Sequence, residues 1–117
     1  MELIEYPKCS TCKKAKKWLE EHQYHFHDRD ITKETPTKEE LKKYLEISGY
    51  PIKKFFNTSG NLYKEFGLKD KLETMTQEEK LTLLSNYGML IKRPLLIFDD
   101  LVLVGFKESE WEVKLKK

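Results

Sequence analysis

The apolar and polar positions near the start of the chain predict a strand followed by an amphipathic helix. The short apolar-rich segment over residues 2–6 is typical of a buried strand. From about Cys9 to His22, the less polar side chains recur at every third or fourth position, which is the spacing of one helix face. That face carries Cys12, Ala15, Trp18, Leu19 and His22. The helix is therefore expected to follow the strand almost directly.

A second strand is predicted from Tyr24 to Ile31, where the side chains alternate. Tyr24 and Phe26 point to one side, and His25 and His27 point to the other. Because a helix lies between them in the chain, the two strands are expected to run parallel as a βαβ unit.

Residues from about 35 to 88 show helical patterns and no convincing strand. Two capping boxes, Thr37-x-x-Glu40 and Thr76-x-x-Glu79, each mark the start of a helix. Shorter helical turns are expected at residues 51–56 and 61–66. Helix ends are expected at Gly49, Gly67 and Gly88. The middle of the chain is therefore predicted to be an all-helical insert.

Strand patterns return after the insert. Two apolar runs, residues 95–98 and 101–104, are joined by the polar pair Asp99-Asp100, which predicts a hairpin. A last helix is expected over residues 108–116. The order is thus βαβ, helical insert, ββα, and the class is α/β.

Composition places the chain among soluble globular proteins. Its 117 residues, 38% hydrophobic and 36% charged, suit one domain over residues 1–117 with a heavily charged surface. The net charge of +2 is too small to indicate a nucleic-acid partner. No apolar run approaches the roughly 20 residues of a membrane span, and the first residues do not resemble a signal peptide. We therefore expect a cytoplasmic monomer that binds neither membranes nor nucleic acid directly.

The chain has two cysteines, and both stand in the segment Cys9-Ser10-Thr11-Cys12 at the first strand-to-helix junction. Unpaired backbone N–H groups and the positive end of the helix dipole favour a thiolate at Cys9. Cys12 follows three residues later on the same side of the helix, so the two sulfurs can meet. Such close spacing cannot join distant segments, and it favours a catalytic pair in a reducing compartment.

Other interpretations of the cysteines and their surroundings remain open. Five lysines crowd the same turns and would lower the thiol pKa where they point toward the sulfurs, although they also suit a solvated helix face. They are Lys8, Lys13, Lys14, Lys16 and Lys17. Two incidental buried thiols are a second possibility. A zinc site could combine Cys12 with His25, but a fourth ligand would have to fall at residues 29–31, which are Arg, Asp and Ile. We therefore expect no metal.

Three segments together resemble the arsenate-reductase/Spx family. They are Tyr6-Pro7-Lys8-Cys9-Ser10-Thr11-Cys12-Lys13-Lys14-Ala15, the pair Arg93-Pro94, and Val104-Gly105-Phe106. The resemblance covers essentially the whole chain. It implies a thioredoxin-like fold with a mixed four-stranded sheet, formed by residues of about 1–34 and 89–117, and a helical insert over about 35–88.

The same resemblance implies roles for individual residues. Cys9 matches the nucleophilic cysteine, and Cys12 matches the second cysteine of the Spx-like members. Arg93 matches an arginine that binds an oxyanion, and Pro94 matches a cis-proline beside the redox site. Further residues expected to bind substrate or thiol are Lys8, Ser10, Thr11 and Lys13.

Two family arginines that hold the oxyanion of arsenate have no counterpart here. Their places hold Asn57 and Phe106, and no arginine occurs between Asp30 and Lys92. Arsenate carries about the charge of phosphate, and several guanidinium groups are needed to bind such an ion tightly. The sequence therefore disfavours arsenate as the substrate.

We expect a thiol–disulfide oxidoreductase of the arsenate-reductase-like family. Cys9 attacks the substrate, and Cys12 resolves the mixed intermediate. No tightly bound cofactor is expected, and the reductant is glutathione or a protein of the thioredoxin or glutaredoxin type. One alternative is an Spx-like redox-sensing regulator that binds the RNA polymerase α subunit. A true arsenate reductase is the other.

Overall fold

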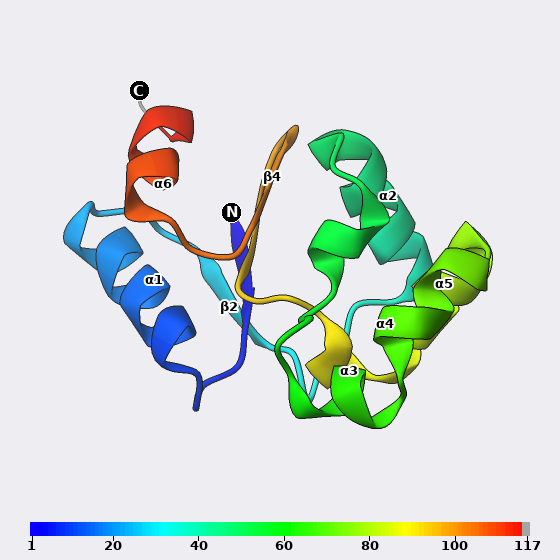
Figure 1. The fold of residues 1–117 in the computed structure, drawn as a ribbon. Helices are drawn as coiled ribbons and strands as arrows, with labels where there is room; N and C mark the ends of the chain where they lie inside the picture. The colour runs from blue at the N-terminus through cyan, green and yellow to red at the C-terminus, as the bar shows by residue number, and fades with distance from the viewer. Residues whose placement is uncertain (116–117) are drawn as a thin grey trace.

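A mixed four-stranded sheet forms the centre of the molecule, and the computed structural model describes residues 1–115 around it (Figure 1). The strands are β1 (Glu2–Glu5), β2 (His27–Asp30), β3 (Leu95–Phe98) and β4 (Leu101–Val104). Their order across the sheet is β2-β1-β3-β4. β1 runs parallel to β2 and antiparallel to β3, which pairs antiparallel with β4. The predicted α/β class and mixed sheet are confirmed.

Neighbouring residues of β1 point to opposite faces of the sheet and so contribute to two separate cores. Leu3 packs with α1 (Ser10–Glu21) and α6 (Glu108–Lys114) on one face. Ile4 packs with the helical insert on the other. Figure 1 shows α1 and α6 together on one side of the strands and α2 to α5 on the opposite side.

The insert is helical, as predicted, but more finely divided than its sequence pattern suggested. Its elements are α2 (Lys38–Ser48), η1 (Ile52–Phe55), α3 (Asn61–Glu65), α4 (Leu68–Lys71), η2 (Leu72–Thr74), α5 (Gln77–Asn86) and η3 (Gly88–Leu90). Both capping boxes are formed, because Thr37 and Thr76 each accept a hydrogen bond at 3.1 Å from the backbone N–H three residues later. The segments α4, η2 and η3 were not predicted, since three or four residues are too few to show helical periodicity.

β2 is shorter than the predicted strand over residues 24–31. β1 begins at Glu2, which pairs with His27, so the residues before His27 have no strand to pair with. Tyr24 instead donates its hydroxyl proton to the carbonyl of Leu115 at 2.7 Å. This bond holds residues beyond the helix α1 against the end of α6.

Two further local expectations have different outcomes. The Asp99-Asp100 hairpin turn is confirmed, and Asp99 adopts a left-handed φ of 52°, which closes the turn without glycine. His22, predicted on the buried face of α1, is exposed. It is the first residue after the helix, and its ring stacks on Trp18 with the ring centroids 4.0 Å apart.

The ends of the described structure bear on two more expectations. The last helix ends at Lys114, and its predicted end at Lys116 lies outside the described residues. Across residues 1–115, no helix has both the length and the apolar character that crossing a membrane requires.

Candidate functional site

Cys9 caps the N-terminus of α1. Its backbone is extended, with φ −84° and ψ 125°, and no side chain forms a capping hydrogen bond to the first turn. The N–H groups of that turn therefore remain available to a negative charge on the Cys9 sulfur. Cys9 is partly exposed, so a substrate sulfur can reach it.

Several groups around Cys9 shift its pKa. Burial by itself raises the pKa of the Cys9 thiol, but the backbone and side chain of Cys12, the backbone of Thr11 and the positive charge of Arg93 together bring it below its ordinary value. None of the five lysines is among these leading causes. Lys16 instead forms an ion pair with Asp28 at 2.6 Å. The helix end and Arg93, rather than the lysines, therefore favour the Cys9 thiolate.

Cys12 has the opposite character. Its side chain is completely buried, and the backbone N–H of Tyr6 donates to its sulfur at 3.5 Å. Burial is the main cause that raises the pKa of the Cys12 thiol to about 12, and the neighbouring Cys9 and Glu5 add to it despite the Tyr6 hydrogen bond. Both cysteines are free thiols. The pair is thus asymmetric: an accessible, acidic thiol stands beside a buried, protonated one.

Arg93 is held beside this pair by its backbone and by its own hydrogen bonds. The Arg93–Pro94 peptide bond is cis, which confirms the prediction. The guanidinium donates from Nη1 to the carbonyls of Met89 and Ile91, both at 3.3 Å, and lies 5.3 Å from the centre of the Tyr6 ring. Its Nε is buried and has no hydrogen-bond partner among residues 1–115. The side chain is therefore oriented while part of its donor capacity stays unused.

A cavity of about 420 Å³ opens beside Cys9 and brings four parts of the chain together. They are the start of α1, the loop after η1, the segment before β3 and the turn after β4. The lining residues are Cys9, Thr11, Asn57, Ser59, Lys92, Arg93, Gly105 and Phe106. The cavity thus joins the predicted Cys9, Thr11 and Arg93 with Asn57 and Phe106, the two positions predicted to correspond to arginines of the reductases.

The other predicted binding residues lie outside this lining. Pro94, next to Arg93 in the chain, is buried. Lys8 in the turn before α1, and Ser10 and Lys13 in the first turn of α1, are exposed. Their roles stay predictions.

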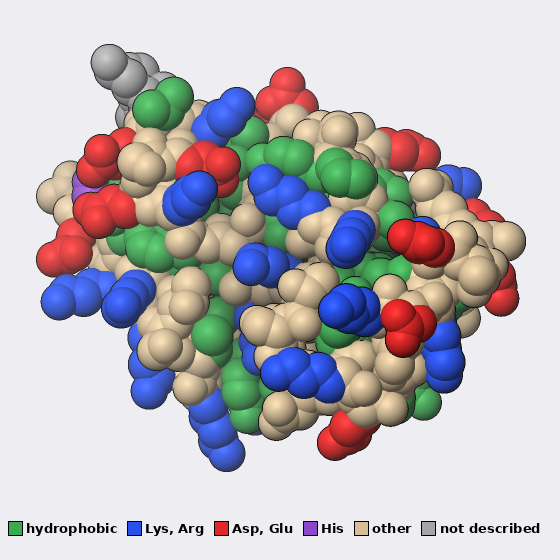
Figure 2. All heavy atoms as spheres, in the orientation of Figure 1, with side chains coloured by type: hydrophobic (Ala, Val, Ile, Leu, Met, Phe, Trp, Pro, Cys, Tyr) green, Lys and Arg blue, Asp and Glu red, His purple; other side chains and the backbone are tan. Residues whose placement is uncertain are grey.

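Lys92 is a cation of the site that sequence reasoning missed. It also lines an adjacent cavity of about 280 Å³, together with Lys54, Lys107 and Glu110. Within the described part of the chain, none of Lys54, Lys92, Arg93 and Lys107 forms an ion pair. Figure 2 shows Lys and Arg side chains gathered in the middle of one face of the molecule. Adjacency to Arg93-Pro94 was the one available signal for Lys92.

No three histidine, cysteine, aspartate or glutamate side chains of residues 1–115 gather in a way that could hold a metal ion.

Comparison with known proteins assigns the family. The family model described as the ArsC family matches residues 4–113. The chain belongs to the ArsC family.

Individual relatives agree with this assignment. The uncharacterized protein YusI of Bacillus subtilis is 55% identical over 107 residues, which are 92% of this chain and 91% of YusI. The regulatory protein MgsR of Bacillus subtilis is 37% identical over 112 residues, covering 96% of this chain and 86% of MgsR. An ArsC family related protein from Bacteroides fragilis has a crystal structure that superposes with a TM-score of 0.93 at 55% identity, covering 98% of this chain and 96% of that one. This ArsC-family chain thus resembles both a regulator and proteins without a stated activity.

Proposed function

We propose that this ArsC-family protein is a thiol–disulfide oxidoreductase that acts on an anionic disulfide. The observation that carries the proposal is the asymmetry between its two cysteines. Cys9 is partly exposed and has a lowered pKa, whereas Cys12 is fully buried and has a pKa of about 12. An attacking thiol must be ionised and accessible, and a resolving thiol needs only to reach its partner sulfur.

The proposed reaction has two steps. In the first, the Cys9 thiolate attacks one sulfur of the substrate disulfide, the substrate S–S bond breaks, and one substrate thiolate leaves with the bonding electron pair. In the second, the Cys12 sulfur attacks the Cys9 sulfur of the mixed disulfide and displaces the other substrate thiolate. The cysteines are then oxidised to a disulfide, and the substrate is reduced to two thiols. A protein of the thioredoxin or glutaredoxin type, or glutathione where the substrate is a different disulfide, supplies the two electrons that restore the thiols.

The charge of the cavity supports an anionic substrate. The positively charged side chains of Arg93 and Lys92 both line the cavity that holds Cys9. Carboxylates such as those of glutathione match these donors. Arsenate is not the proposed substrate, because Asn57 and Phe106 provide no positive charge at two positions where the reductases use arginine.

A trapping experiment tests the proposal. In Cys12→Ser, the mixed disulfide on Cys9 cannot be resolved, so exposure to glutathione disulfide should leave glutathione on nearly every molecule. Cys9→Ser should leave almost none and should abolish disulfide reduction. Intact-protein mass spectrometry measures both. Equal labelling of the two variants would refute the role of Cys9.

A second candidate function is redox regulation of transcription, and one specific finding favours it. MgsR, a regulatory protein, is 37% identical to this chain over nearly its whole length. In this alternative, the Cys9–Cys12 disulfide changes the affinity for the RNA polymerase α subunit. Binding to the purified C-terminal domain of that subunit, measured with reduced and oxidised protein, distinguishes the two. Micromolar binding that depends on the disulfide would favour the regulator.

A further inference from the structure

Glu5 is a nearly completely buried carboxyl group in the strand that leads to the cysteines. Only 3% of its surface is exposed. Because side chains alternate along β1, Glu5 lies on the same face as Leu3, which is the face covered by α1. A buried acid is costly unless neighbouring groups compensate it. A carboxyl group buried beneath the helix that begins at the two cysteines therefore needs polar or charged neighbours.

The groups around Glu5 come from two elements. α1 provides Cys12 and Lys16, which lie one turn apart on the same side of the helix. β2 provides Asp28 and Asp30, the partners of Leu3 and Glu5 in the sheet register. Glu5 shares a hydrogen bond with Asp28, and Asp28 forms the ion pair with Lys16 at 2.6 Å. Glu5 is thus the buried member of a polar cluster with Asp28 and Lys16 between α1 and the edge of the sheet, and these two other members reach solvent.

This cluster sets the protonation of Glu5. Burial raises the pKa of Glu5 most, and the hydrogen bond and charge of Asp28 raise it further. The charge of Lys16 lowers this pKa and that of Asp30 raises it, so that the pKa of Glu5 is about 7. Asp28 itself is shifted the other way: burial raises its pKa, but its bonds to Glu5 and Lys16 lower it more. Asp28 therefore carries the permanent charge, and Glu5 can gain or lose a proton near neutral pH.

Cys12 needs such a proton acceptor. Its thiol is fully buried, so bulk water cannot take its proton directly, and its sulfur has the Tyr6 backbone N–H as its hydrogen-bond donor. Glu5 directly precedes Tyr6, whose N–H contacts the Cys12 sulfur, and both Glu5 and Cys12 are buried between β1 and α1. We propose that Glu5 accepts the proton of Cys12 as Cys12 attacks the mixed disulfide on Cys9. This inference rests on the proposed function, because it concerns the second step of that reaction.

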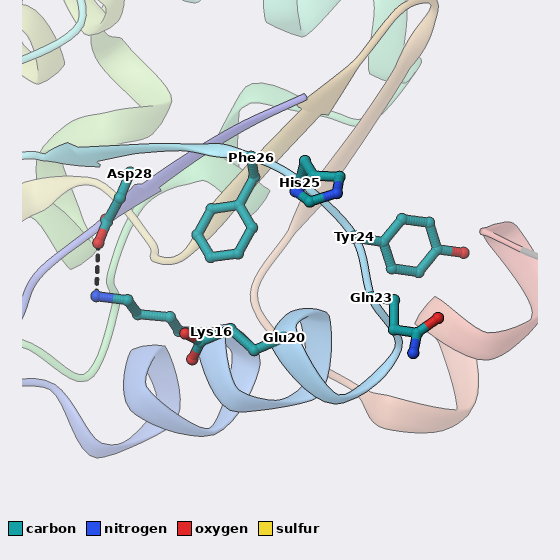
Figure 3. A pocket seen from close by; sticks show the side chains of 7 residues that line it. All are labelled: Lys16, Glu20, Gln23, Tyr24, His25, Phe26 and Asp28. Atoms are coloured by element: carbon teal, nitrogen blue, oxygen red, sulfur yellow. Dashed lines mark ion pairs between the residues drawn. The ribbon is translucent and has the colours of Figure 1, made fainter.

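Proton transfer accompanies the exchange of disulfide bonds. The proton moves from the Cys12 sulfur to the Glu5 carboxylate, and the Cys12 sulfur bonds to the Cys9 sulfur. The bond between Cys9 and the substrate sulfur breaks, and the substrate leaves as a thiolate with the electron pair. Glu5 can then release the proton to solvent beside Asp28, whose side chain is about a third exposed (33%). Figure 3 shows Asp28 and Lys16 paired at the edge of a cavity of about 730 Å³, which gives this route access to solvent.

The test separates the two steps with Ellman's reagent. Attack by Cys9 releases one thionitrobenzoate and leaves a second on Cys9, and attack by Cys12 releases that second one. In Glu5→Gln, we expect the second release to slow by about 100-fold at neutral pH and to lose its inflection near pH 7. In Asp28→Asn, the inflection should move to lower pH, because a hydrogen bond and a charge that raise the pKa of Glu5 are lost. Stopped-flow absorbance over a range of pH measures both phases.

Matched variants exclude a purely structural effect. Glu5→Asp keeps a carboxyl group and should recover part of the rate together with a pH inflection, whereas Glu21→Gln changes an exposed acid of α1 outside the cavity beside Asp28 and should leave the second release unchanged. If Glu5 were only a neighbouring charge, Glu5→Gln would lower the pKa of Cys12 and speed the second release.

The two proposals fail in different ways. Absence of the first release would refute the role of Cys9 and with it the proposed function. A normal first release, followed by a second release that is unchanged or faster in Glu5→Gln, would refute the role of Glu5 alone.

Discussion

At the scale of single residues, Arg93 has two separable effects on the site. Its positive charge helps to lower the pKa of Cys9, and in the proposed function its planar guanidinium, which lines the cavity, binds the anionic substrate. A lysine at this position would keep the charge but lose the fixed planar donor group. The two effects can therefore be measured apart.

Two variants, Arg93→Met and Arg93→Lys, separate the effect of the charge from that of the planar donor group. We expect the pKa of Cys9 to rise in Arg93→Met, because a lowering charge is removed, and to stay closer to that of the parent in Arg93→Lys. Both variants should lose about 10-fold in kcat/KM for glutathione disulfide, the amount expected for one hydrogen bond to a charged group. The rate of iodoacetamide alkylation against pH, in a Cys12→Ser background, reports the pKa. An unchanged profile in Arg93→Met would show that Arg93 does not act on the thiol.

At the scale of elements, Glu40 joins the first helix of the insert to the sheet. It completes the capping box of α2 by accepting the Thr37 backbone N–H at 3.0 Å. The same carboxylate accepts two hydrogen bonds from Arg29 of β2, at 2.8 and 2.9 Å. Arg29 is only 8% exposed, and Glu40 is the nearer of its two carboxylate partners, since Glu2 lies at 3.4 Å. The hydrogen bond from Arg29 is the main cause that lowers the pKa of Glu40 to about 2.

We therefore expect Glu40→Gln to lower the free energy of unfolding by about 2 kcal/mol, less than for a fully buried pair because Glu40 is partly exposed to solvent. Glu79→Gln is the matched control, since Glu79 completes the same capping box on α5 without an arginine, and it should cost well under half as much. Because the folded pKa of Glu40 lies below its unfolded value, its contribution is present above about pH 4.5 and is lost as pH falls toward 2. Urea denaturation at pH 7 and pH 3 measures both effects, and equal losses in the two variants would exclude the role of Arg29.

The elements also show which features were predictable from the sequence. Capping boxes, the helix end at Gly49 and the two-residue hairpin were predicted because each depends on residues that are close in the chain, whereas the end predicted at Gly88 was wrong, because α5 ends at Asn86 and Gly88 begins η3. The length of β2 was not, because it depends on where β1 begins. The charge cluster of Glu5 was missed for the same reason: its partners come from α1 and β2, and the sequence signal was a single acid within an apolar strand. The spacing of the cysteines at the start of a helix indicated Cys9, and resemblance supplied Arg93, but only the fold shows that Lys92 shares their cavity.

At the scale of the whole molecule, charge is distributed unevenly although it nearly cancels. The net charge is only +2, yet the two adjoining cavities beside Cys9 are lined by Lys54, Lys92, Arg93 and Lys107, with Glu110 as the one acid of their lining. A local excess of one charge attracts ligands of the opposite charge, and salt weakens this attraction. Substrate preference should therefore follow the charge of these cavities rather than the net charge of the protein.

Two disulfides of opposite charge test this expectation. We expect kcat/KM to be higher for glutathione disulfide, which is anionic, than for cystamine, which is cationic. The ratio of the two kcat/KM values should shrink as ionic strength rises from about 0.01 to 0.15 M, because the screening length falls from about 30 to 8 Å. Lys92→Gln and Lys107→Gln should each lower the ratio by about 2- to 3-fold, as expected for partly exposed charges. Lys69→Gln, on α4 and outside both cavities, should leave it unchanged. A ratio of kcat/KM values that does not change with ionic strength, or that falls equally in all three variants, would mean that the lysines beside Cys9 do not select the substrate.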